Sequence, residues 1–414
     1  MRAFLTVLRQ LSMCEVTTEA VHRRLLESFQ AALEAGSLSV TELGRHLPGR
    51  ASVKAKVKTM WRRLLQQGER REDHALYRAL SHALLKGIER PVLLVDWTAC
   101  NAQALLCVAL AHDGRALPLF LELHPLSDFG KSSLEAAFLK TLHQEILPCG
   151  QAVVCTDAGF RSAWFEGVEA LGWDYLGRLT PDVQLQCVCA TTELWVEAQA
   201  LGLLGTDTPE ELGQYRVGKA ARVQRRVVRY HGRLCRAPSQ RRGPSPKGGD
   251  HGKKYRRQAE RGWMLVTSLS AQEVPADALV ALYATRMQIE ELFRSIKSPV
   301  YGQGTGESRS HSASVLAGLW LLASLRAVVL HLVGLVAEQH GWHRLYQTNT
   351  SGRRVLSLMS LGKLVLRHHD QRQVTPARLR HALELVRQRA DRDALANSGV
   401  RRLASANPKG RQAA

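Results

Sequence analysis

The stretch YATRMQIEELFRSIK, residues 283–297, is the part of the sequence that says most about the fold and its use. It contains neither proline nor glycine and is rich in good helix formers, so it is predicted to be helical. On a helix of 3.6 residues per turn, four polar side chains fall within an arc of about 60°: Tyr283, Arg286, Glu290 and Lys297. A carboxylate flanked by cations can hold a divalent metal ion and phosphate oxygens. An ordinary solvated face with i,i+4 ion pairs would show the same pattern.

The composition indicates a polyanionic partner. The chain has 414 residues, enough for two or three domains, and a net charge of +20 from 57 Lys and Arg against 37 acidic residues. Such an excess most often serves nucleic acid binding. The eight cysteines include no CxxC pair, so we expect free thiols in a reducing compartment. Residues 315–337 are apolar enough to cross a membrane, but Arg326 and His331 lie within them, which favours a buried helix of a soluble protein.

The first 75 residues are predicted to be all helical. Thr41 can cap a short helix at 42–47, and Ser52 opens another that runs to residue 66. A short helix, a tight turn and a second helix make a helix-turn-helix pattern. The second helix carries basic side chains that could meet DNA phosphates: Lys54, Lys56 and Lys58. The alternative is a plain helical bundle with one basic side.

An α/β layer is predicted from residue 91 onward. Residues 92–95 form a buried strand with Asp96 at its end, and 152–156 form another with Asp157 at its end. Strands at 105–111, 117–123 and 175–179, with a helix at 132–147, complete a mixed sheet. Ligands in such sheets bind at strand ends, although a single Asp after a strand is often only a helix cap.

A basic segment interrupts this layer at residues 180–262. Residues 216–261 hold sixteen Lys or Arg against two acidic residues. Strand-like alternation at 183–189 and 222–230 argues against a plain linker. Trp263 then opens an apolar strand at 263–268, where an indole is by default part of the core.

Three carboxylates from separate elements form the candidate catalytic set. Asp96, Asp157 and Glu290 are separated by 61 and 133 residues. Carboxylates that converge in this way can hold two divalent cations, which activate a water or a 3′-hydroxyl for attack on phosphorus.

The chain resembles the DDE transposases of bacterial insertion sequences, in the subgroup named for its Tyr–Arg–Glu–Lys signature. The signature Y-x2-R-x3-E-x6-K is met in full by residues 283–297, and the sequences VDWT around Asp96 and TDAGF around Asp157 also fit. The resemblance covers roughly residues 10–390 and is specific, because the motifs follow one another in the family's order.

The resemblance implies an α/β fold with a ribonuclease H-like mixed sheet at residues 88–310, interrupted by a β-strand insertion at 180–262. It also implies a helical N-terminal domain at 1–75 that binds DNA ends, and C-terminal helices at 311–414 that could serve dimerisation. The implied activity is cut-and-paste movement through DNA hairpins, with two Mg²⁺ or Mn²⁺ ions, in a homodimer on double-stranded element ends and target DNA, without a membrane. The implied location is the cytoplasm of a bacterium, at the nucleoid.

The resemblance also suggests roles for single residues. In the family, the Tyr, Arg and Lys of the signature hold DNA phosphates near the cut. The resemblance implies the same role for Tyr283, Arg286 and Lys297. In the family, a tryptophan at the start of the preceding strand stacks on a flipped base. The resemblance implies this role for Trp263. Two other functions stay open: a ribonuclease H-like nuclease that cuts without joining, and a non-catalytic DNA-binding derivative.

Overall fold

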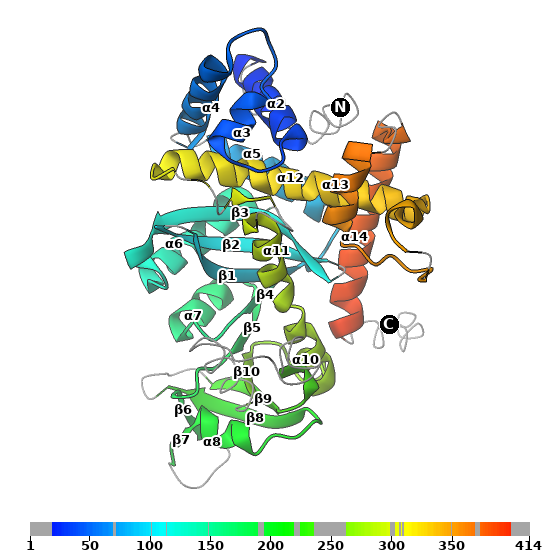
Figure 1. Ribbon diagram of the computed structural model, residues 1–414. Helices are drawn as coiled ribbons and strands as arrows, with labels where there is room; N and C mark the ends of the chain where they lie inside the picture. Colours follow the sequence, from blue (N-terminus) through cyan, green and yellow to red (C-terminus); the bar gives the residue numbers. More distant parts are fainter. Residues whose placement is uncertain are drawn as a thin grey trace, which may run out of the picture.

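The computed structural model describes residues 19–68, 72–100, 102–112, 114–147, 149–188, 194–218, 224–235, 262–298, 303–305, 308, 310–348, 350–368 and 373–398. Within these ranges the chain builds one ten-stranded mixed sheet, in the order β3-β2-β1-β4-β5-β10-β9-β8-β6-β7. Helices cover the sheet and extend above it (Figure 1).

The first five strands form the half of the sheet that carries the acidic residues. They are β1 (Val92–Cys100), β2 (Gln103–His112), β3 (Arg115–Pro125), β4 (Val153–Thr156) and β5 (Asp174–Arg178). The first three are antiparallel to one another, whereas β4 pairs in parallel with both β1 and β5. Their side chains are almost entirely buried, as expected for strands covered on both faces. This mixed arrangement is compatible with a ribonuclease H-like fold.

The other five strands continue the same sheet from β5 outward. They are β6 (Gln184–Cys187), β7 (Val196–Glu197), β8 (Glu210–Val217), β9 (Gln224–Tyr230) and β10 (Trp263–Thr267). The described part of the basic segment is therefore joined edge to edge to the acidic half through β10, which pairs antiparallel with β5 on one side and β9 on the other. Strand β8 was not among the strands predicted from the sequence.

Three arginines of β9 are held by carboxylates of the chain itself. Arg226 is 4% exposed and forms an ion pair with Glu211 at 2.6 Å, and Arg229 pairs with Glu210. Arg225 is 2% exposed, bonds the Tyr175 hydroxyl at 2.6 Å and lies over the Tyr175 ring. Part of the charge that the sequence suggested for DNA is thus used to fix β9 to β8 and β5.

Helices lie on both faces of the acidic half. On this half they are α6 (Ser132–Thr141) with its extension η3 (Leu142–Ile146), α7 (Ser162–Ala170) and α11 (Met287–Lys297). Helix α8 (Ala198–Leu203) packs instead on β7, β9 and β10, and α10 (Ala276–Ala284) packs on α14. The short turns are η2 (Leu126–Asp128) and η4 (Arg233–Cys235). Successive strand residues point to opposite faces, and Trp97 reaches Glu135 of α6 whereas Thr98 reaches Lys297 of α11. Helices α6 and α11 therefore cover opposite faces.

The sequence predicted one regular helix over the signature stretch, residues 283–297, but in the structure this stretch is divided between two helices. Helix α10 ends at Ala284 and α11 begins at Met287, and the amides of Arg286 and Ile289 bond the carbonyls three residues earlier, those of Tyr283 and Arg286. The turn is tightened to 3₁₀ geometry while keeping right-handed helical dihedrals. The hydroxyl of Thr285 donates to the carbonyl of Leu282 at 2.7 Å, a contact that bends helices.

A central buried helix, α12 (Ala313–Gln339), joins the remaining helices to the sheet (Figure 1). It is the one helix of the described residues long and apolar enough to cross a membrane, and its apolar window is wholly buried inside the protein. Its Arg326 donates to the backbone carbonyl of Ala35 at 3.0 Å. Around it pack α2 (Glu19–Glu34), α4 (Val53–Gly68), η7 (Trp342–Tyr346), α13 (Leu358–His368) and α14 (Pro376–Ser398). Helix α3 (Val40–Arg45) packs on α4 and α2, and α5 (Glu72–Leu85) packs on β3 and α14.

Helices α3 and α4 lie where the sequence placed its helix-turn-helix. The cap of α3 is Ser39, whose hydroxyl accepts from the amide of Glu42, rather than Thr41 as predicted. A Cβ on Gly44 would meet the Cα of Val57 at 2.5 Å, so glycine permits the close contact of the two helices. These helices share one hydrophobic core with α12.

Candidate active site

Two of the predicted carboxylates follow a residue pair that joins two neighbouring parallel strands. Val95 of β1 pairs with Thr156 of β4, so Asp96 and Asp157 each follow one member of this pair. Strands in a sheet are about 4.8 Å apart. Asp157 directly follows β4 as predicted, but Asp96 lies in the middle of β1, because the residues after it continue the ladder with β2.

Glu290 is brought to this pair by α11, and Arg286 connects them. The Arg286 guanidinium donates from Nη1 to Oδ2 of Asp96 at 3.3 Å and from Nη2 to Oε1 of Glu290 at 2.5 Å. Only 11% of the Arg286 side chain is exposed. The apolar face of α11 packs on β1, β2 and β3, which fixes Glu290 and Arg286 over the strand that carries Asp96.

Burial and negative charge act together on Asp96. Desolvation is the largest cause that raises the pKa of its carboxyl, the Arg286 guanidinium lowers it, and the carboxylates of Asp157 and Glu290 raise it. Together these effects bring the pKa from 3.8 to about 8. The three acidic side chains therefore interact electrostatically. In the part of the chain that the structure describes, however, they do not converge closely enough to form a complete metal-ligand cluster.

The donor chemistry of the three residues fits a hard divalent cation. Carboxylate oxygens are the ligands that Mg²⁺ and Mn²⁺ prefer. Because burial raises the pKa of Asp96, a cation bound beside it would stabilise its carboxylate form. Arg286 already places positive charge beside Asp96 and Glu290.

Lys297, at the C-terminal end of α11, contacts the part of β1 that follows Asp96. Its Nζ donates to the carbonyl of Ala99 at 2.7 Å and to the hydroxyl of Thr98, and it lies 5.5 Å from the centre of the Phe293 ring. Burial lowers the pKa of its ammonium group. No sequence pattern indicated Thr98 as a partner, because its placement depends on the unexpected extension of β1.

Tyr283 and Trp263 are buried beside the site. They are 3% and 6% exposed, and their ring centroids lie 4.8 Å apart, edge to face. Tyr230 covers the indole from another side at 5.8 Å. Burial raises the pKa of the Tyr283 hydroxyl to about 12. A base would reach the Trp263 ring only after one of the two tyrosines moves.

The predicted lysines of α4 are not part of this site. Lys54 and Lys58 are exposed and Lys56 is half-buried. Helix α4 packs on α12 above the sheet in Figure 1, whereas the three carboxylates belong to the sheet and α11 below it.

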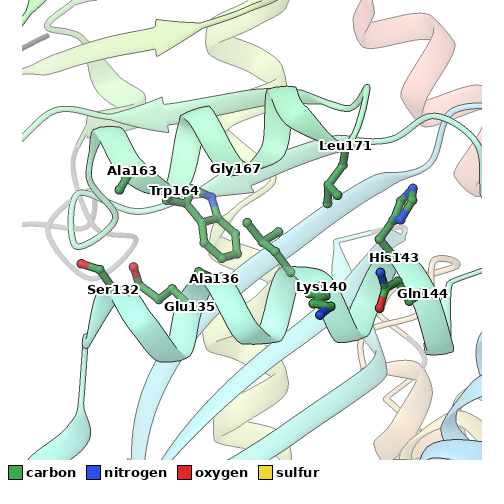
Figure 2. Close-up of a pocket in the computed structure, with 11 residues that line it drawn as sticks. Ser132, Glu135, Ala136, Lys140, His143, Gln144, Ala163, Trp164, Gly167 and Leu171 are labelled. Atoms are coloured by element: carbon green, nitrogen blue, oxygen red, sulfur yellow. The ribbon is translucent and has the colours of Figure 1, made fainter.

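Glu135 is a further acidic residue near the carboxylates that sequence reasoning missed. Glu135 is 4% exposed and accepts a hydrogen bond from the indole N–H of Trp97 at 3.0 Å. This bond fixes Trp97, the residue that follows Asp96 in β1. Burial raises the pKa of the Glu135 carboxyl, and Asp157 adds to the effect. Glu135 lines a pocket of about 160 Å³ between α6 and α7, on the α6 side and opposite Trp164 (Figure 2). Its position at the start of a helix was no signal, since acidic residues are common there.

Comparison with known proteins identifies the family of the chain. Residues 90–326 match the family model described as a transposase DDE domain, and this range contains β1, β4, α11 and all three carboxylates. No curated protein matches the chain. The matched range is more than half of the 414 residues, so the chain belongs to the family of transposases with a DDE domain.

Proposed function

We propose that this transposase binds the terminal inverted repeats of an insertion sequence and excises the element by metal-dependent hydrolysis and hairpin formation. It then joins the element to target DNA by 3′-hydroxyl strand transfer. The observation that carries the proposal is that Asp96 and Asp157 each follow one member of the Val95–Thr156 pair of adjacent parallel strands, with Glu290 linked to Asp96 through Arg286.

Asp96, Asp157 and Glu290 would hold two Mg²⁺ or Mn²⁺ ions, which generally serve the members of this family. When bound, the ions supply Lewis acidity at the scissile phosphate. A water attacks phosphorus and the 3′-oxygen leaves with a proton. The freed 3′-hydroxyl then loses its proton and attacks a phosphorus of the opposite strand, and the 3′-oxygen displaced there takes up a proton, which closes a hairpin. A second water hydrolyses the hairpin and restores the 3′-hydroxyl, which attacks target DNA in the same way during strand transfer. The acidic side chains position the reacting phosphate and balance its charge.

Arg286 is the residue that changes partners in this scheme. In the free chain its guanidinium bonds Asp96 and Glu290. On DNA we assign it, with Tyr283 and Lys297, to the phosphates beside the cut, because a guanidinium matches phosphate oxygens as well as carboxylates. Binding of DNA would thus free the carboxylates for cations.

Binding of the element ends is assigned to α4. The exposed Lys54 and Lys58, with the half-buried Lys56, would meet phosphates, and a homodimer would bridge the two ends. The proposed site of action is the bacterial cytoplasm, at the nucleoid.

The test is incubation of the full chain with labelled DNA that carries the candidate element ends, a target plasmid and Mg²⁺. Nicks, hairpins and joined products together support the proposal. Cleavage without joined products would show a nuclease, and binding without any cleavage would show a non-catalytic derivative.

The pKa of Asp96 predicts the pH dependence of metal binding. This pKa is raised from 3.8 to about 8, so the carboxyl is mostly protonated below pH 8 and must lose its proton to become a ligand. We expect Mn²⁺ affinity to rise about tenfold per pH unit up to pH 8 and then to level off. Calorimetry in buffers of different ionisation enthalpy should detect about one proton released at pH 7. An affinity that is constant from pH 6 to pH 8 would contradict this state of Asp96.

Trp263 predicts a defect in one step. If its ring stacks on a flipped base, which is worth about 1–3 kcal/mol, Trp263→Ala should slow hairpin formation about 5- to 150-fold and leave first-strand nicking near normal. An abasic site at the flipped position should partly restore hairpins. Because the indole is buried, Trp263→Phe serves as a variant that keeps most of the packing. Equal losses of nicking and hairpin formation in both variants would place Trp263 in the core alone.

A further inference from the structure

A basic cavity lies between α2 and α4, away from the carboxylates. It measures about 470 Å³. Four arginines and a single carboxylate stand among its walls, and we call it the arginine groove: Arg23, Arg24, Arg62, Arg63 and Glu27. Thr59 and Gln66 add neutral hydrogen-bonding groups. Nothing in the catalytic scheme uses this cavity.

The two helices that form the arginine groove are packed into the core. Phe29 of α2 and Met60 of α4 are fully buried. Helix α4 is also held to α12, since a Cβ on Gly318 would meet the backbone oxygen of Leu64 at 2.8 Å. The arginines therefore project from two helices whose positions are set by packing, which reduces the entropy cost of binding a ligand.

The charges of the arginine groove are only partly balanced. Glu27 pairs with Arg63 Nη2 at 2.7 Å, while Arg63 Nη1 is buried and has no partner among the described residues. The groove has four arginines and one carboxylate, so three of its positive charges are not balanced by an acidic residue of the groove. Like charges held close together in a concave site repel one another, and such a site attracts and concentrates anions.

The arginine groove continues a basic line along α4. Lys54, Lys58 and Arg62 are spaced four residues apart and share one side of the helix. They span about 12 Å at 1.5 Å per residue. Each strand of duplex DNA presents one phosphate per about 3.4 Å of its axis, so several phosphates can follow this line from Lys54 to the groove.

We propose that the arginine groove binds the sugar–phosphate backbone of duplex DNA and extends the contact of α4 across to α2. The proposal rests on the proposed function and deepens it by placing a second part of the duplex on α2. Phosphate contacts set the position of a protein on DNA without reading its sequence, so this site acts alike on all sequences.

The experiment compares the full chain with the double variant Arg23→Gln/Arg24→Gln, both on α2, on a fluorescein-labelled 30-base-pair duplex of mixed sequence. Each lost phosphate contact reduces the slope of log K against log salt by about 0.9. Between 50 and 200 mM salt, the variant should therefore lose about tenfold less affinity than the unchanged chain. The matched control is Arg344→Gln/Arg380→Gln on η7 and α14, which should keep the full slope.

Glu27→Gln tests the same site in the opposite direction. It removes the negative charge of the groove and frees Arg63, so binding should become tighter and its salt dependence steeper. A purely structural role of these side chains would not produce tighter binding.

The outcomes separate the two proposals. Unchanged slopes in the arginine double variant and in Glu27→Gln overturn the groove and leave DNA cleavage as the separate test of function. Failure of the unchanged chain to bind any duplex overturns the proposed function, and the groove with it.

Discussion

Replacing any one of the three carboxylates is expected to abolish strand cleavage while DNA binding persists. For Asp96→Asn, Asp157→Asn and Glu290→Gln we expect a loss of about 10³-fold or more, because a metal ion contributes several kcal/mol of charge stabilisation in the transition state. The measurement is Mg²⁺-dependent nicking of labelled end DNA, set beside binding of the same duplex in a gel-shift assay.

The fold should tolerate these changes. In Asp96 the neutral form is already favoured at neutral pH, since its pKa lies at about 8, so a neutral asparagine suits the site. The midpoint temperature of thermal unfolding of Asp96→Asn, measured without metal, should therefore be no lower than that of the unchanged chain.

Glu291→Gln is the matched control for Glu290→Gln. Glu291 is the next residue on α11 but pairs with Arg115 at 2.8 Å and Arg294 at 2.6 Å, away from Asp96. It should keep cleavage within about threefold, since a partly exposed ion pair is worth about 1 kcal/mol or less. Equal losses in the Glu290 and Glu291 variants would refute the assignment of Glu290.

The strands with the acidic residues were readable because apolar runs and their limits are local signals. The runs predicted at 92–95, 152–156 and 263–268 correspond to β1 (Val92–Cys100), β4 (Val153–Thr156) and β10 (Trp263–Thr267), and the run at 315–337 lies within the buried helix α12. Strand β8 was missed because its sequence EELGQYRV is polar, and its charges become acceptable in a sheet only through the arginines of β9. Such cross-strand pairs depend on the tertiary fold, which periodicity does not report.

The candidate site could be predicted in its parts but not in its connections. Asp157 and Glu290 lie where the patterns placed them, whereas Asp96 stands within a strand that continues to Cys100. The tightened turn between α10 and α11 was not visible, because Thr285 is compatible with a regular helix. The bridge from Arg286 to Asp96 joins residues 190 positions apart, and spacing along one helix cannot reveal it.

That bridge leads to the second large effect, on metal affinity. Arg286 occupies oxygens of Asp96 and Glu290, so a cation that binds the free chain must first break these contacts. Hydrogen bonds to charged groups are worth about 1.5–3 kcal/mol each. Loss of this competition in Arg286→Gln should strengthen Mn²⁺ binding to the DNA-free protein about 10- to 100-fold, as measured by calorimetry or by the electron paramagnetic resonance signal of free Mn²⁺.

In the same variant, binding of Mn²⁺ and binding of DNA should no longer strengthen each other. If duplex DNA draws Arg286 to a phosphate in the unchanged chain, it raises Mn²⁺ affinity, and Mn²⁺ must raise DNA affinity by the same factor. In Arg286→Gln the Mn²⁺ affinity should already be high without DNA and should change little when DNA is added. Arg294→Gln, which removes an exposed arginine paired with Glu291, should behave as the unchanged chain does. If Arg286→Gln binds Mn²⁺ no more tightly than the unchanged chain, Arg286 does not compete with the cation, and its contacts with Asp96 and Glu290 serve only to fix α11 on β1.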